Sequence, residues 1–169
     1  MRWITKIMDL LLYGNFWTSA AAVAMSWQTE WILTGRLRGG PLSWFIFCAT
    51  LCLYAAHRLI GMEKVAAFRD RGRFRVIARY RRHILWYALL AAAGGAWAFF
   101  LLSPEVQWGV LPPALFSLAY VLPVFGRQRR LRDLHYIKIF LIAGVWAWVT
   151  VALPALSVDL ERNIPLWVM

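Results

Sequence analysis

The stretch Tyr54–His83, YAAHRLIGMEKVAAFRDRGRFRVIARYRRH, decides how this chain is organised, because it joins the end of one apolar run to the start of the next. Between Glu63 and His83 this stretch contains only two acidic residues, Glu63 and Asp70. It contains eight cations, which are Lys64, Arg69, Arg71, Arg73, Arg75, Arg79, Arg81 and Arg82. A dense basic segment between two apolar runs is typical of a cytoplasmic loop in a membrane protein. Arginines of such a loop are also suited to contact phosphate groups.

The composition of the whole chain indicates a membrane protein. Of its 169 residues, 62% are hydrophobic and 16% are charged, whereas a soluble domain has about 45–50% apolar and about 25% charged residues. A soluble core of this size could not bury so much apolar surface, but lipid accepts it. The net charge of +11 is confined to short loops. Membrane topology explains that charge, so we expect no nucleic-acid partner.

Five apolar runs are close to the length of about 20 residues that a spanning helix needs. Turn signals end two of them, namely Gly35–Pro41 after the first run and Ser103-Pro104 after the third. The fourth run is the shortest, and its early Pro112 and Pro113 suit the first turn of a helix. We therefore expect one all-α transmembrane domain, residues 1–169, with helices at about 10–33, 42–62, 84–102, 108–125 and 137–157.

Lys and Arg residues are divided unequally between the two ends of such a bundle. One end carries only Arg36, Arg38 and Arg162. The other end carries 15, which are the eight cations above together with Arg2, Lys6, Arg127, Arg129, Arg130, Arg132 and Lys138. Cytoplasmic loops are rich in Lys and Arg. We therefore expect an integral protein of a bacterial inner membrane, with the N-terminus and both basic loops in the cytoplasm and the C-terminus outside.

The arginines of the two basic loops, residues 63–83 and 126–138, are the main candidates for binding an anion. On a helix, Arg71, Arg75, Arg79 and Arg82 would fall within an arc of about 80°. They could line one pocket for an anionic headgroup with Arg127, Arg129 and Arg130, since the guanidinium fork fits phosphate oxygens. The alternative is a segment lying on anionic lipid, where each cation contributes on the order of 1 kcal/mol.

His57 and Arg58 lie near the basic end of the second run and are further candidates for ligand binding. Ionisable residues within a span are costly and mark functional sites. The alternative for Arg58 is that its side chain extends from the helix end to the membrane interface.

Two groups of small residues suggest packing rather than chemistry. Cys48 and Cys52 share one helical face, but two thiols without a nearby His make a poor metal site. Ala88, Ala92 and Ala96 repeat every four residues, and such a stripe allows close approach of two helices.

Three blocks of the sequence resemble the first half of UbiA-type intramembrane prenyltransferases. They are YGNFW from Tyr13, LYAAHRLIG from Leu53, and AYVLPVFGRQRRLRDLHYIKIFLIAGVWAWVTVALP from Ala119 to Pro154. In the last block Tyr120, then Pro123, then a basic cluster lead from the fourth helix into the fifth. The resemblance covers about Tyr13–Pro154. It implies an all-helical bundle whose larger relatives bind a prenyl diphosphate through magnesium held by two aspartate-rich motifs.

The first of these motifs resembles Asn-Asp-x-x-Asp-x-x-x-Asp and follows the second helix. In this sequence that place is Tyr54–Glu63, where the aspartates are missing and only Glu63 could stand for the last acid. Magnesium usually takes one or two carboxylates plus phosphate oxygens. Glu63 is therefore a weak metal candidate, and we expect Mg²⁺ only if the chain is an enzyme. In the family the second motif belongs to a later helix, beyond the five helices that we expect here.

Three functions remain open on the sequence. The first is a non-catalytic or degenerate UbiA-like protein that binds an isoprenoid or anionic lipid headgroups at its cytoplasmic face. The second is part of an active prenyltransferase, completed by missing helices or by another chain. The third is an accessory subunit of a larger membrane complex. We expect no catalytic residue in this chain alone. The expected partners are membrane lipids, an isoprenoid or prenyl diphosphate, and further copies or other chains in an oligomer.

Overall fold

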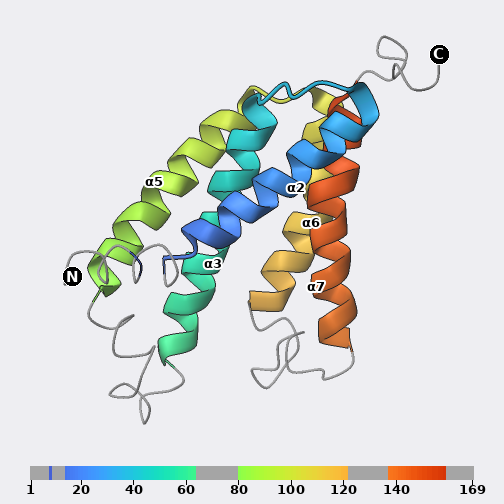
Figure 1. Ribbon diagram of the computed structural model, residues 1–169. Helices are drawn as coiled ribbons and strands as arrows, with labels where there is room; N and C mark the ends of the chain where they lie inside the picture. The colour runs from blue at the N-terminus through green and yellow to red at the C-terminus, as the bar shows by residue number, and fades with distance from the viewer. Residues whose placement is uncertain (1–7, 9–13, 64–79, 122–136, 159–169) are drawn as a thin grey trace.

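The structure is a computed structural model, and it describes residues 8, 14–63, 80–121 and 137–158. Within these ranges every regular element is helical and no strand occurs, which confirms the all-α prediction. The elements are α2 (Phe16–Thr34), α3 (Pro41–Glu63), α5 (Arg81–Phe100), α6 (Pro104–Val121), α7 (Ile137–Ala147), the π-helix η3 (Trp148–Ala152) and α8 (Leu153–Ser157) (Figure 1). The last three follow one another without a break and form one helical rod.

Three segments have the length and apolar composition needed to cross a membrane: Pro41–Leu59, Arg81–Phe100 and Lys138–Ser157. They are consistent with an integral membrane protein. The other two predicted spans, now α2 and α6, are long enough but include polar residues. Gln28 and Glu30 lie in α2, and Glu105 and Gln107 lie in α6. These side chains lower the apolar content of both helices, so composition supports three of the five predicted spans.

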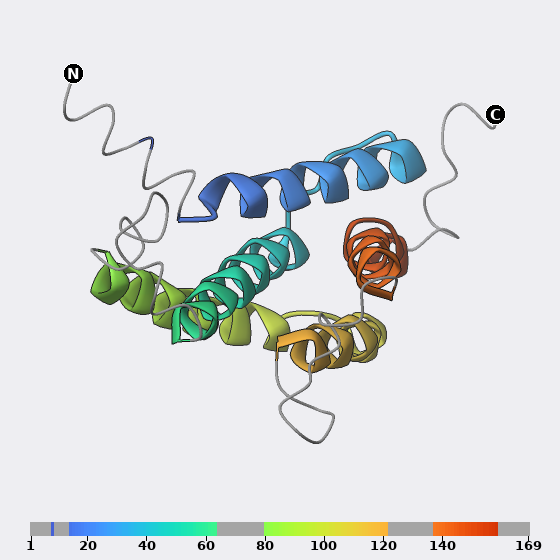
Figure 2. The same cartoon turned by 90° about the horizontal axis from the view of Figure 1, so that it is seen from below.

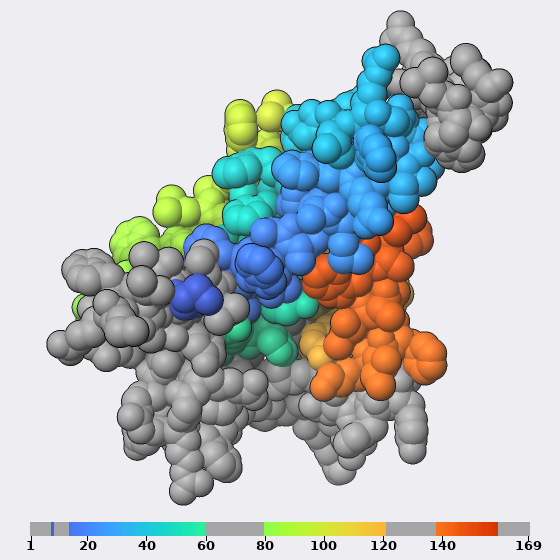
Figure 3. All heavy atoms as spheres, viewed as in Figure 1, coloured from blue at the N-terminus to red at the C-terminus, as the bar shows by residue number. Residues whose placement is uncertain are grey.

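The described helices form two groups that are joined by α2. In one group α3 packs along α5, and in the other α6 packs against α7, η3 and α8. The helix α2 packs against α3 in the first group and against η3 and α8 in the second. Figure 2 shows α2 crossing above both groups. In the space-filling view α2 covers the centre of one face, with α5 on one side and α7 on the other (Figure 3).

The connections between the helices lie at two opposite ends of the bundle. At one end α3 and α6 finish and α5 and α7 begin, and we call it the basic end because both basic loops follow from it (Figure 1). At the opposite end α2 leads into α3 through residues 35–40, and α5 leads into α6 through residues 101–103. Gly35 ends α2 with a φ of 66°, a conformation that suits glycine, and its N–H donates to the Trp31 carbonyl.

Small residues on α5 let it lie close to α3. A Cβ added at Gly95 would lie 3.3 Å from the Cβ of Cys48, which is itself buried. The buried positions of α5 are Ile84, Ala88, Ala91, Gly95 and Ala98. The predicted stripe was therefore right at Ala88 but wrong at Ala92 and Ala96, which are exposed. In a helix of 3.6 residues per turn, residues stay on one face when they are spaced alternately three and four apart. Residues spaced strictly four apart move gradually around the helix, away from that face.

Two helices start at other residues than the sequence predicts. The helix expected from about residue 10 starts at Phe16, because Asn15 takes a left-handed φ of 65°. The helix expected from 108 starts at Pro104, which suits the first turn because proline lacks an N–H. Pro112 and Pro113 therefore lie inside α6 rather than at its start.

Candidate functional site

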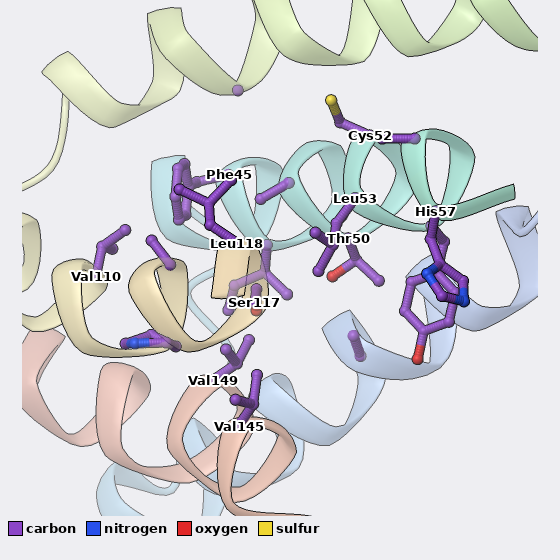
Figure 4. A pocket seen from close by; sticks show the side chains of 18 of the residues that line it. Phe45, Thr50, Cys52, Leu53, His57, Val110, Ser117, Leu118, Val145 and Val149 are labelled. Atoms are coloured by element: carbon purple, nitrogen blue, oxygen red, sulfur yellow. The ribbon is translucent and has the colours of Figure 1, made fainter. Parts of the chain in front are cut away.

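An apolar cavity of about 570 Å³ lies between the two groups of helices (Figure 4). Its volume falls within the range of about 300–1,000 Å³ that is usual for sites of small ligands. The side chains that line it include Phe45, Thr50, Leu53, Ala92, Gly95, Ala96, Val110, Ala114, Ser117, Leu118, Leu141, Val145 and Val149. Most of these are apolar, and the alanines and glycine of α5 are small. The cavity is therefore suited to an aliphatic chain.

The polar side chains of the cavity gather towards the basic end. His57 in the last turns of α3 faces Tyr120 in the last turn of α6, with ring centroids 5.9 Å apart and the planes tilted by 37°. Nearby, the indole Nε1 of Trp146 donates a hydrogen bond of 3.4 Å to the hydroxyl of Tyr54. All four side chains line the cavity. A molecule in the cavity would therefore find hydrogen-bonding groups at this end.

The opposite end of the cavity is lined by buried apolar packing. Ala22, Ile46, Val110 and Leu153 belong to one buried cluster contributed by α2, α3, α6 and α8, and each of them also lines the cavity. Ile46 and Leu153 are each only 1% exposed. The lining of the cavity is thus apolar and buried at one end and polar at the other.

The structure brings one predicted site residue, His57, to the cavity. Arg58 is partly buried on the same helix and is not among the lining residues. Arg82 is exposed in the first turn of α5. The remaining predicted phosphate-binding residues lie outside the described residues: Arg71, Arg75, Arg79, Arg127, Arg129 and Arg130. Their convergence on one anion therefore stays a prediction.

The described side chains beside the cavity do not fit a magnesium site. Glu63 ends α3, but its side chain is not among those that the structure describes. The described carboxylate side chains are those of Glu30 and Glu105, and neither lines the cavity. Within the described ranges, no group of three or more His, Cys, Asp or Glu residues gathers. Magnesium prefers carboxylate and phosphate oxygens, so these residues provide no ligand set for it.

Sequence reasoning missed three residues of the polar end, namely Tyr54, Tyr120 and Trp146 as a group around His57. Tyr120 was noted only as part of a family-like block. A signal was present for Tyr54 and Tyr120, because each lies in the half of its apolar run nearer the basic end, whereas Trp146 lies in the middle of its run. Their convergence depends on how α3, α6 and α7 pack, which a single sequence does not give.

Comparison with protein-family models, with curated proteins and with solved structures finds no match for this chain. The resemblance to UbiA-type prenyltransferases therefore stays a prediction from the sequence. The cavity and its polar end carry the functional argument.

Proposed function

We propose that this chain is a non-catalytic, UbiA-like membrane protein that holds the apolar chain of an isoprenoid or of an anionic lipid in its cavity. The headgroup lies at the basic end, near His57 and Tyr120. The proposal rests on how polar side chains are distributed in the cavity. Most of the lining is apolar, and polar side chains gather at the end of the bundle from which both basic loops follow. We place this end on the cytoplasmic side of a bacterial inner membrane, because of the unequal division of Lys and Arg.

The headgroup must supply most of the selectivity. Moving an aliphatic chain from the bilayer into an apolar cavity gains little hydrophobic free energy, because lipid tails are as apolar as the cavity wall. A hydrogen bond from the headgroup to His57 or Tyr120 contributes about 0.5–1.5 kcal/mol net. Each cation close to an anionic headgroup contributes on the order of 1 kcal/mol. An anionic or strongly hydrogen-bonding head is therefore favoured over a neutral one.

The alternatives have less support. Part of an active prenyltransferase would need carboxylates to hold magnesium, and the place for the first motif offers only Glu63. An accessory subunit of a larger complex would need no cavity of this size. Nothing among the described residues favours either alternative over a lipid-binding protein.

The proposal is tested by filling the cavity. Ala96 lines it, and a phenylalanine at this position would occupy part of the space meant for the lipid chain. We expect Ala96→Phe, purified in mild detergent, to carry severalfold less co-purified lipid in native mass spectra than the wild type.

Ala93→Phe is the matched control, because Ala93 is exposed on the same helix and does not line the cavity. This variant should keep its lipid. Equal lipid retention by Ala96→Phe and Ala93→Phe would show that the cavity holds no lipid chain and would refute the proposal.

A further inference from the structure

Two prolines inside helices leave two backbone carbonyls without their usual donor. In an α-helix each carbonyl accepts from the N–H of the residue four positions later, and proline has no N–H. Pro113 therefore removes the donor for the carbonyl of Gly109 in α6. Pro154 does the same for the carbonyl of Thr150 in the helical rod. In an apolar environment such carbonyls need donors from neighbouring helices.

Thr29 of α2 supplies the donor for the Thr150 carbonyl. The Thr29 hydroxyl donates to this carbonyl at 2.8 Å, whereas it lies 3.2 Å from the Met25 carbonyl of its own helix. A hydroxyl has a single hydrogen to donate, so the shorter contact is the better bond. Because Thr150 belongs to the π-helix η3, this bond ties η3 to α2.

Trp148 supplies the donor for the Gly109 carbonyl. Its indole Nε1 donates to this carbonyl at 2.9 Å. Trp148 is the first residue of η3, so this second bond ties the same π-helix to α6. The two hydrogen bonds therefore hold η3 between α2 and α6.

The helical rod that contains η3 forms one wall of the lipid cavity. Val145 and Val149 of the rod line that wall (Figure 4). Trp146 donates to the Tyr54 hydroxyl of α3 at the polar end. Successive residues of a helix are turned by about 100°, so Trp146 and Trp148 lie on nearly opposite sides of the rod. Holding Trp148 against α6 therefore directs Trp146 towards α3.

We propose that Thr29 and Trp148 are positioning residues for the lipid site. Their hydrogen bonds hold the rod in the rotation that brings Trp146 to the polar end of the cavity. This inference rests on the lipid-binding function proposed above. Neither Thr29 nor Trp148 lines the cavity, so each acts through the rod and not by contact with the lipid.

The first test is lipid retention by Thr29→Val and Trp148→Phe, which each remove one donor and leave a carbonyl unpaired. Both variants should carry severalfold less co-purified lipid in native mass spectra than the wild type. Thr29→Ser keeps the hydroxyl and should keep its lipid. The matched controls are Thr18→Val, about three helical turns earlier on α2, and Trp108→Phe, since Trp108 is 74% exposed. Both controls should behave like the wild type.

The second test measures the position of the rod, which a loss of stability alone would not change. Spin labels are attached at Phe140→Cys on α7 and Leu90→Cys on α5, both at exposed positions, after the two native cysteines have been replaced by alanine. Pulsed electron paramagnetic resonance gives the distribution of distances between the labels. This distribution should be broader or shifted in Thr29→Val and in Trp148→Phe, and unchanged in Thr29→Ser.

Wild-type distances in both donor-removing variants would overturn the proposal, and so would full lipid retention despite a displaced rod. Ala96→Phe separates this result from the proposed function. If Ala96→Phe loses its lipid and the donor-removing variants keep theirs, the cavity binds lipid but these hydrogen bonds do not position it. If Ala96→Phe keeps its lipid, the proposed function fails, and the positioning role of Thr29 and Trp148 fails with it.

Discussion

At the scale of single residues, two glycines in neighbouring helices have opposite roles. A Cβ at Gly109 of α6 would lie 2.7 Å from Cδ1 of Leu156 and 3.1 Å from Cδ2 of Leu153. Leu156 is partly exposed and could turn away, but Leu153 is fully buried. Nothing lies within 4 Å of a Cβ at Gly144 in α7. Gly109 is therefore needed for close packing, whereas Gly144 is not.

We predict that Gly109→Ala and Gly144→Ala change stability in opposite directions. Overpacking costs about 1–3 kcal/mol, and alanine gains up to about 1 kcal/mol over glycine in a helix. Gly109→Ala should therefore destabilise by up to about 2 kcal/mol, and Gly144→Ala should stabilise by about 0.5–1 kcal/mol. Unfolding midpoints in the same detergent measure both. A stabilised Gly109→Ala variant would contradict the close contact with Leu153.

At the scale of elements, the sequence predicted where helices lie better than where they begin. The apolar runs located α3 and α5 within a few residues, because α3 starts at a proline, Pro41, and α5 starts at an arginine, Arg81. The predicted start of α6 was wrong because Glu105 and Gln107, which precede the apolar run from 108, belong to the helix. The Gln107 amide donates to the carbonyls of Phe99, in the last turn of α5, and of Leu102, just after that helix. This bridge between two elements leaves no periodic pattern in the sequence.

The π-helix was also invisible in the sequence, because it is tied to its neighbours by tertiary contacts. Thr29 donates to the Thr150 carbonyl, and the indole of Trp148 donates to the Gly109 carbonyl at 2.9 Å.

Within the candidate site, the sequence predicted His57, because an ionisable residue is costly within a membrane span and therefore marks a functional position. It could not find the cavity, because the space beside Ala92 and Ala96 exists only once α6 and α7 are placed.

At the scale of the whole molecule, the division of charge and the arrangement of helices point to the same two ends. The helix ends that lead into the basic loops lie together, and the segment with Arg36 and Arg38 lies at the other end (Figure 1). The sequence that follows from one end of the bundle is therefore strongly basic, and the segment at the other end is weakly basic. By the positive-inside rule, we expect the strongly basic end to face the cytoplasm.

We predict that residues 37 and 75 are accessible from opposite sides of the membrane. Single cysteines are introduced as Leu37→Cys and Arg75→Cys after Cys48 and Cys52 have been replaced by alanine. A membrane-impermeant maleimide added to right-side-out vesicles should label position 37, which is exposed, and should label position 75 only after lysis. Labelling of both positions in intact vesicles would refute this topology.

Our last prediction is that this chain alone does not transfer a prenyl group. Such a reaction ionises an allylic diphosphate, and magnesium stabilises the leaving group by several kcal/mol as a Lewis acid. Arginines of the basic loops could supply part of that stabilisation, but the place for the first metal motif offers only Glu63 as a carboxylate. Water would also compete for a carbocation in a site that is not fully enclosed.

The purified chain, given prenyl diphosphates, magnesium and aromatic or quinone-type acceptors, should therefore release no diphosphate above a heat-denatured control. The same preparation should still carry lipid in native mass spectra, so that a lack of turnover is not confused with loss of the fold. Turnover that requires magnesium and disappears in Glu63→Gln would make Glu63 a metal ligand, and the chain would then be an enzyme.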